Sequence, residues 1–194
     1  MSEKILILDF GSQFTQLIAR CVREANVYCE IIPYNKTFVI DDTLKGIILS
    51  GSPFSVNDDN YPSVDIATFI QKVPVLGVCY GAQLTAKVFG GTVNKSNKRE
   101  YGRAILQTRN GEDVLLKDIS PNSQVWMSHS DSIVALPADF TILATTESIP
   151  VAAFKKTSSN SLPLYGLQFH PEVYHSTEGK TLIKNFLVNI WVKL

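Results

Sequence analysis

Short apolar runs that alternate with helical patterns limit the fold of this chain more than any other feature. Nearly continuous apolar runs, typical of strands buried on both faces, lie at residues 5–10, 27–33, 46–50 and 73–78. We expect helices at residues 13–25, 62–72 and 80–89. The second helix begins at Pro62, which suits a first turn, and the third is closed by Gly90 and Gly91. Such an alternation predicts a mostly parallel sheet with helices on both faces.

The second half of the chain has short strand patterns with few helices between them. We expect strands at residues 104–108, 125–127, 142–145, 151–154 and 164–169. They suggest antiparallel additions to the same sheet or a small separate sheet. Residues 177–194 close the chain as a helix with a broad apolar face. The predicted fold class is therefore α/β, a doubly wound sheet in three layers with a small antiparallel extension.

The length and composition narrow the class of protein. A chain of 194 residues fits a single domain over residues 1–194. Lysine plus arginine and aspartate plus glutamate number 18 each, so no basic surface indicates nucleic acid or an anionic membrane. No apolar run approaches the roughly 20 residues of a membrane span, and no secretory leader pattern is found. Three widely spaced cysteines form neither a disulfide framework nor a metal motif, so we expect a cytoplasmic protein without a metal.

A cysteine between two glycines marks the end of the fourth predicted strand. The segment GVCYG at residues 77–81 places Cys79 between a strand and a helix, the geometry of a nucleophile elbow. The helix N-terminus favours a thiolate, and the N–H of Tyr80 is the expected oxyanion donor. The alternative is that Cys79 only packs in a tight turn. Cys21 and Cys29, in periodic apolar segments, have that structural role.

A thiolate nucleophile needs an imidazole, and the chain offers His129, His170 and His175. His170 directly follows an apolar strand, so it is expected at the edge of the sheet where α/β sites form. Residues i and i+2 of an extended chain face the same way, so the carboxylate of Glu172 can hold the ring. The sequence thus predicts a triad of Cys79, His170 and Glu172.

The segments GVCYGAQ at residues 77–83 and FHPE at residues 169–172 resemble the class I, triad-type glutamine amidotransferases. Further segments, namely LDFGSQ, SGSP, REYG, WMSHSD and HPEVYHS, resemble the branch of that family found in GMP synthetases. The resemblance runs almost from end to end of the chain. It implies a flavodoxin-like three-layer fold and L-glutamine as the substrate.

The same resemblance implies a role for each matching residue. Cys79 would be the nucleophile, His170 the general base and then acid, and Glu172 the residue that orients the imidazole. The backbone N–H groups of Tyr80 and Ser52 would stabilise the oxyanion. The glutamine would be held by residues at four further positions, which are Gly51, Gln83, Ser130 and Asp131.

One position departs from the family pattern. The family usually has Ser-Gly-Gly-Pro where this chain has SGSP at residues 50–53. Ser52 keeps the backbone N–H that the oxyanion needs. A serine at this position would be strained if the loop required a positive φ.

The resemblance also implies a partner. Glutamine hydrolysis itself needs no cofactor, whereas ATP and Mg²⁺ belong to an ATP-pyrophosphatase domain that activates xanthosine monophosphate (XMP). We find no such domain in the chain, so it would supply ammonia either as a piece of a longer protein or as a separate subunit. His129 is expected to shape the glutamine-site loop, and His175 either faces the partner or is solvated.

Three other functions are compatible with parts of the pattern. The first is a glutaminase subunit for anthranilate or CTP synthesis, against which the LDFGSQ, WMSH and HPEVYHS segments argue. The second is a cysteine hydrolase acting on peptides or γ-glutamyl conjugates, which Gln83 and the missing leader disfavour. The third is an interaction module without catalysis, which would be expected to lack part of the triad.

Overall fold

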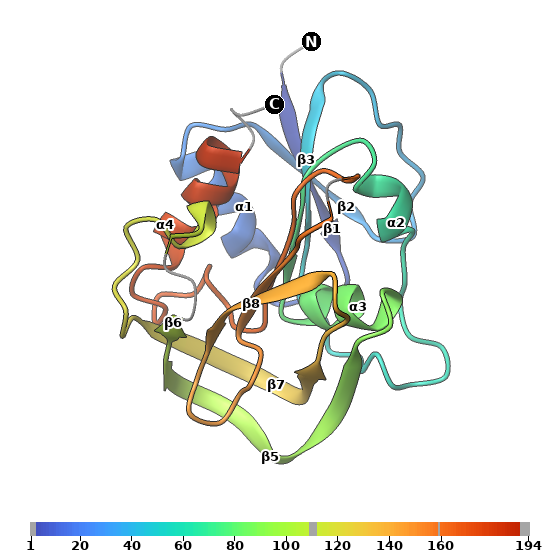
Figure 1. Cartoon of the computed structure of the whole chain (residues 1–194). Helices are drawn as coiled ribbons and strands as arrows, with labels where there is room; N and C mark the ends of the chain where they lie inside the picture. The colour runs from blue at the N-terminus through green and yellow to red at the C-terminus, as the bar shows by residue number, and fades with distance from the viewer. Residues whose placement is uncertain (1–2, 109–111, 159, 191–194) are drawn as a thin grey trace.

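One large sheet organises the part of the chain that the computed structural model describes, namely residues 3–108, 112–158 and 160–190. Its strands are β1 (Lys4–Asp9), β2 (Cys29–Pro33), β3 (Leu44–Leu49), β4 (Val75–Val78), β6 (Gln107–Thr108), β8 (Phe140–Thr145), β9 (Ala153–Lys156) and β10 (Leu164–Leu167). They are ordered β2-β1-β3-β4-β10-β9-β8-β6 (Figure 1). The first five strands in this order run parallel, and β9, β8 and β6 extend the sheet in antiparallel pairs.

The mixed sheet confirms the predicted fold class, with one refinement. Antiparallel additions were expected throughout the second half, yet β10 pairs parallel with β4. The reason is the reversal between β9 and β10, which are antiparallel neighbours. That reversal turns the last strand into the direction of β4 and brings it to the middle of the sheet.

A second, two-stranded sheet crosses the end of the molecule where β4 and β10 finish (Figure 1). It pairs β5 (Thr92–Ile105) with β7 (Gln124–Ala135), and both strands are longer than predicted. Residues 128–131, expected in a loop, belong to β7. Their side chains alternate between buried and partly buried positions, with His129 and Asp131 buried. This period of two is the pattern of a strand, although its members are polar.

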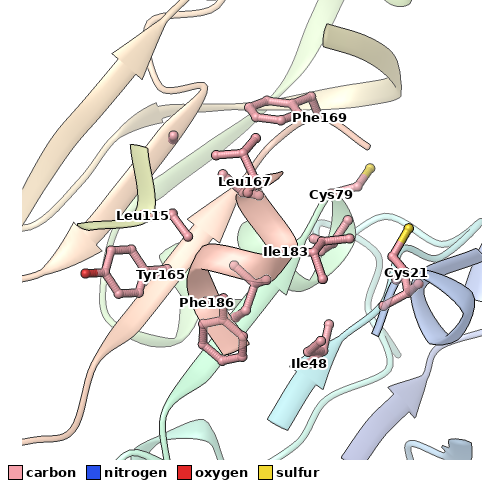
Figure 2. Close-up of a cluster of buried hydrophobic side chains, with 14 of the residues drawn as sticks. Cys21, Ile48, Cys79, Leu115, Tyr165, Leu167, Phe169, Ile183 and Phe186 are labelled. Atoms are coloured by element: carbon pink, nitrogen blue, oxygen red, sulfur yellow. The ribbon is translucent and has the colours of Figure 1, made fainter. Parts of the chain in front are cut away.

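Helices cover both faces of the large sheet, as a doubly wound fold requires. Figure 1 shows α1 (Thr15–Glu24) and α4 (Gly179–Asn185) on one side, and α2 (Ile66–Phe69) and α3 (Tyr80–Val88) on the other. Alternate residues of one strand serve the two sides: Ile5 and Ile7 pack with the first pair of helices, Leu6 and Leu8 with the second. Figure 2 shows part of the first cluster, where Ile183 and Phe186 at the end of the chain lie over Ile48.

Two predicted helices differ in their limits. α2 begins at Ile66 rather than at Pro62, because the Asp65 side chain accepts the N–H of Thr68 at 3.0 Å and so caps the helix there. The last helix starts at Gly179 and continues as a π-helical turn over Phe186–Ile190. Residues 191–194 of the predicted helix lie outside the described part of the chain. None of the described helices combines the length and apolar character needed to cross a bilayer.

Candidate active site

Cys79 stands in a strained turn between β4 and α3. Its backbone has φ of 51° and ψ of −103°, a left-handed conformation that non-glycine residues rarely adopt. Its N–H donates to the carbonyl of Leu167 at 2.7 Å, which ties the turn to β10. Strain of this kind persists only where the surroundings enforce it, and it is concentrated at functional sites.

The two glycines around Cys79 are required by close packing. A Cβ on Gly77 would lie 2.6 Å from the carbonyl carbon of Gly81, and a Cβ on Gly81 would lie 2.5 Å from the carbonyl oxygen of Leu49. The start of α3 thus sits directly against β3 and β4. This close approach is the geometry that the GVCYG pattern predicted.

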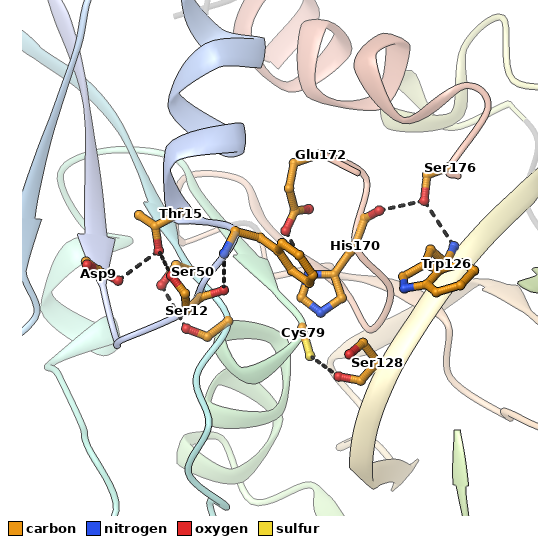
Figure 3. Close-up of polar contacts among 12 residues, drawn as sticks. Asp9, Ser12, Thr15, Ser50, Cys79, Trp126, Ser128, His170, Glu172 and Ser176 are labelled. Atoms are coloured by element: carbon orange, nitrogen blue, oxygen red, sulfur yellow. Dashed lines mark hydrogen bonds and ion pairs between the residues drawn. The ribbon is translucent and has the colours of Figure 1, made fainter. Parts of the chain in front are cut away.

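His170 follows the end of β10 and faces Cys79. Figure 3 shows the imidazole between the sulfur of Cys79 and the carboxylate of Glu172. The Nδ1 atom of His170 lies 2.7 Å from Oε1 of Glu172, and both side chains are buried. Burial disfavours the charged ring, but the negative charges of Cys79 and Glu172 outweigh it and raise the pKa of His170 well above its ordinary value.

The backbone of His170 is fixed by a residue that the sequence did not single out. Ser176 donates its hydroxyl to the carbonyl of His170 at 2.5 Å and accepts the N–H of Trp126 at 3.0 Å (Figure 3). The N–H of His170 in turn donates to the carbonyl of Trp126. The N–H and the carbonyl of His170 are therefore both tied to β7, the carbonyl through Ser176. The serine of the HPEVYHS segment was the available signal.

A cavity of about 420 Å³ opens in front of the sulfur. Its lining includes most of the predicted site residues, which are Ser52, Cys79, Tyr80, Gln83, Ser130, Asp131 and His170. The other two lie just behind the wall. A Cβ on Gly51 would be 3.2 Å from the His170 ring, and Glu172 is buried beyond that ring. The fold therefore gathers at one place all nine residues that were predicted from distant segments.

The two residues whose N–H groups are predicted to bind an oxyanion, Tyr80 and Ser52, both line the cavity. No hydrogen bond within the described residues uses the N–H of Tyr80 or that of Ser52. The hydroxyl of Ser52 donates to the carbonyl of Phe10 at 2.8 Å, which anchors the loop after β3. Ser52 is not among the described residues with a positive φ, so serine replaces the usual glycine there without that strain.

One wall of the cavity is polar. Gln83 is buried and donates its Nε2 to the backbone carbonyl of Asp131 at 2.8 Å. The Asp131 side chain accepts the hydroxyl of Ser55 through Oδ2. Asp131 is only 4% exposed. Among the side chains that the structure describes, which do not include those of residues 96–100, no lysine, arginine or histidine forms an ion pair with it. A buried carboxylate without a cation is costly, so its presence on a cavity wall suggests a cationic ligand.

The two other histidines, His129 and His175, differ sharply in their exposure to solvent. His129 lines the cavity from β7, and burial lowers its pKa to about 4, so it is neutral near pH 7. His175 is exposed and stacks on Trp126, with ring centroids 4.5 Å apart. Within the described residues, no group of three or more histidine, cysteine, aspartate or glutamate side chains is gathered as metal ligands would be.

The sequence is similar to known proteins over almost its whole length. The glutamine amidotransferase class-I family pattern matches residues 6–190. A GMP synthase [glutamine-hydrolyzing] of Cytophaga hutchinsonii is 59% identical over 190 residues, covering 98% of this chain and 37% of that protein. The corresponding protein of Phocaeicola vulgatus is 53% identical, covering 98% and 36%. The chain thus spans little more than a third of the length of these relatives.

Solved structures agree with the fold. A candidate GMP synthase subunit from Thermoplasma acidophilum is 29% identical with a TM-score of 0.79, covering all of this chain and 96% of that one. A glutamine amidotransferase from Thermotoga maritima is 19% identical with a TM-score of 0.74, covering 98% of each chain. At that identity the second likeness shows the fold alone.

Proposed function

The chain belongs to the class I glutamine amidotransferases, and from this premise we propose that it hydrolyses L-glutamine to glutamate and ammonia. The observation that carries the proposal is the juxtaposition of Cys79, on its strained elbow, with the His170–Glu172 pair at the wall of one cavity. A residue that only filled a packing turn would need neither the cavity nor the charged pair.

The first half of the reaction forms a thioester. The raised pKa of His170 keeps a proton on the imidazole and leaves the sulfur of Cys79 as the attacking thiolate. Attack on the side-chain amide carbon moves the carbonyl electrons onto oxygen, where the N–H groups of Tyr80 and Ser52 stabilise the charge. His170 then gives its proton to the amide nitrogen, the C–N bond breaks, and ammonia leaves.

The second half of the reaction restores the enzyme. The neutral imidazole of His170 takes a proton from water, and the resulting hydroxide attacks the thioester carbon. The C–S bond breaks, glutamate leaves, and the thiolate and the protonated imidazole are regenerated. Glu172 holds the ring through Nδ1 in both halves. These steps need no cofactor.

We infer that the polar wall holds the amino-acid end of the substrate. The α-ammonium of glutamine is the cation that the buried carboxylate of Asp131 lacks. Gln83 fixes the backbone of Asp131, and the backbone at Ser130 and Gly51 completes the frame around the ligand. A γ-carboxamide carrying an α-ammonium therefore fits the two ends of the cavity.

The use of the ammonia is inferred from the relatives. The proteins of Cytophaga hutchinsonii, Phocaeicola vulgatus and Bacteroides fragilis carry the name GMP synthase, which favours amination of XMP over anthranilate or CTP synthesis. We infer that an ATP-pyrophosphatase domain, covalently joined or separate, consumes the ammonia with ATP and Mg²⁺. The three free cysteines suit a reducing compartment such as the cytoplasm.

Labelling with 6-diazo-5-oxo-L-norleucine, a glutamine analogue that alkylates thiolates, tests the nucleophile. We expect peptide mapping to find the label on Cys79, and Cys79→Ala to abolish glutamine hydrolysis. His170→Asn should lower kcat by about 10²–10⁴-fold, the usual contribution of a general acid–base. Cys21 and Cys29 serve as internal controls, since both are buried away from the cavity. A label found on these two alone would refute the assignment.

A further inference from the structure

Ser55 joins two parts of the cavity that are distant in sequence. It belongs to the segment between β3 and α2, three residues after the oxyanion donor Ser52. Its hydroxyl donates to Oδ2 of Asp131 on β7 and accepts the N–H of Asn57 at 3.0 Å. In the described part of the chain, no other side-chain hydrogen bond connects this segment to β7.

The loop is also held on both sides of Ser55. Before Ser55, the hydroxyl of Ser52 binds the carbonyl of Phe10 at 2.8 Å. After Ser55, the ammonium of Lys87 on α3 binds the carbonyl of Val56. Phe54 is exposed, whereas Val56 is buried in the core and anchors the loop to the body of the fold. Among the described side chains, the hydrogen bond of Ser55 is the one that fixes the loop against the polar wall.

The carboxylate of Asp131 also depends on this contact. Oδ2 accepts from Ser55, whereas Oδ1 accepts no hydrogen bond from a described residue. Without Ser55 the buried carboxylate would lose the one hydrogen bond that it accepts from a described side chain and would be free to turn away from the cavity.

We propose that Ser55 is a positioning residue that couples recognition of the α-ammonium to the oxyanion loop. By holding Asp131 and the Ser52 loop in one hydrogen-bonded unit, it fixes the distance between the groups that bind the two ends of the substrate. The proposal rests on the glutaminase function inferred above. It predicts that Ser55 contributes to the discrimination between glutamine and amides without an α-ammonium, although Ser55 itself touches neither end of the substrate.

Steady-state kinetics with two substrates separates this role from simple stabilisation. The second substrate is glutaramate, which is glutamine without its α-amino group. Asp131→Asn removes the charge but keeps a side-chain oxygen that can accept the Ser55 hydroxyl, so it should raise KM for glutamine about tenfold and change KM for glutaramate much less. Ser55→Ala should raise KM for glutamine to a similar degree, and it should also lower kcat about tenfold for both substrates, because the oxyanion loop loses its tie. Ser55→Thr keeps the hydroxyl and should restore most of both parameters.

A matched control and a double variant complete the test. Ser120→Ala removes a comparable serine–carboxylate contact, that of Ser120 with Glu178 at 3.0 Å, on an exposed surface away from the cavity. It should change neither parameter. The effects of Ser55→Ala and Asp131→Asn on KM for glutamine should be far from additive, since Ser55 acts on the α-ammonium only through the carboxylate of Asp131. Kinetics of Ser55→Ala within twofold of the parent chain would overturn the proposal.

Binding measurements keep the proposal testable if the glutaminase function fails. Titration of L-glutamine into the Cys79→Ala variant reports affinity without turnover. The double variant with Cys79→Ala and Ser55→Ala should bind glutamine about tenfold more weakly. An unchanged affinity would overturn the coupling. A parent chain that binds glutamine but never hydrolyses it would refute the proposed function alone.

Discussion

Cys21, Cys29 and Cys79 are all buried, with exposed fractions of 6%, 2% and 4%. Burial raises the pKa of Cys21 to about 11 and raises that of Cys29 as well, which leaves both as inert thiols. Cys79 differs in its surroundings, since it has a positive φ, a helix N-terminus and a histidine beside it. The chemistry of a cysteine in this chain therefore follows from the turn that carries it.

His129 gives a prediction at the same scale. Burial lowers its pKa in the folded chain to about 4, against an ordinary value of 6.5. Between these two values the unfolded chain binds a proton that the folded chain does not, so the free energy of unfolding falls as pH decreases. The loss should be complete near pH 4 and amount to about 3 kcal/mol, at 1.36 kcal/mol for each pKa unit.

Denaturant unfolding of the parent chain and of His129→Gln, at steps from pH 8 to pH 4, checks this. Glutamine is neutral throughout, so the variant should lose about 3 kcal/mol less than the parent chain on acidification. His170 has the opposite sign, because its raised pKa adds stability below pH 6.5 that is lost as pH rises through the folded value. Parallel curves for the two proteins below pH 6.5 would contradict the prediction.

At the scale of elements, apolar periodicity predicted the existence of most strands and helices but not all of their limits. The run at residues 164–169 indicated a strand, yet nothing local says whether its partner is parallel, because direction depends on the β9 reversal. The extent of β7 was missed because its inward-facing positions beyond Met127 are polar, including His129 and Asp131. These polar side chains face the cavity rather than the apolar core, so the apolar alternation of a buried strand is missing there.

The geometry of the elbow depends on the close contact between α3 and β3. Gly81 places the first turn of the helix so close to Leu49 that a Cβ would overlap its carbonyl oxygen. Gly81→Ala should therefore displace the helix, lower the free energy of unfolding by about 1–3 kcal/mol and slow the labelling of Cys79. Chemical denaturation and the labelling rate measure the two effects.

Gly90, at the other end of the same helix, is the matched control. Its φ is 89°, but a Cβ there would meet nothing within 4 Å. Gly90→Ala should lose about 1–2 kcal/mol through backbone strain while Cys79 is labelled at the parent rate. Equal labelling rates in all three proteins would show that the packing of Gly81 does not set the elbow.

At the scale of the molecule, the site could be predicted because several of its residues directly follow the ends of neighbouring strands. Ser52, Cys79 and His170 follow β3, β4 and β10, which are adjacent and parallel. The carboxyl ends of such strands meet at one edge, so strand-end motifs converge whatever their separation in sequence. Ser55 and Ser176 could not be predicted in this way. Their contacts with Asp131 and with the carbonyl of His170 depend on how β7 and the segment after β10 are placed in the fold.

The rim of the cavity raises the question of what covers it. Phe54 and Tyr101 line the cavity and are 55% and 62% exposed. Large apolar side chains gathered around an opening are typical of interaction surfaces. The relatives are almost three times as long as the matched region, so they contain a long additional stretch of chain.

We therefore predict that the chain alone hydrolyses glutamine slowly and that a synthetase partner accelerates it. Water enters an open site and weakens the interactions that stabilise the oxyanion, whereas a covering domain excludes it. Addition of an ATP-pyrophosphatase domain from a GMP synthase, with ATP, Mg²⁺ and XMP, should raise glutamate formation at least tenfold, as followed with glutamate dehydrogenase. The partner without XMP should have a smaller effect, and Cys79→Ala should form no glutamate although GMP is still made from added ammonia. Rapid hydrolysis by the chain alone, unchanged by the partner and its nucleotides, would contradict the coupling.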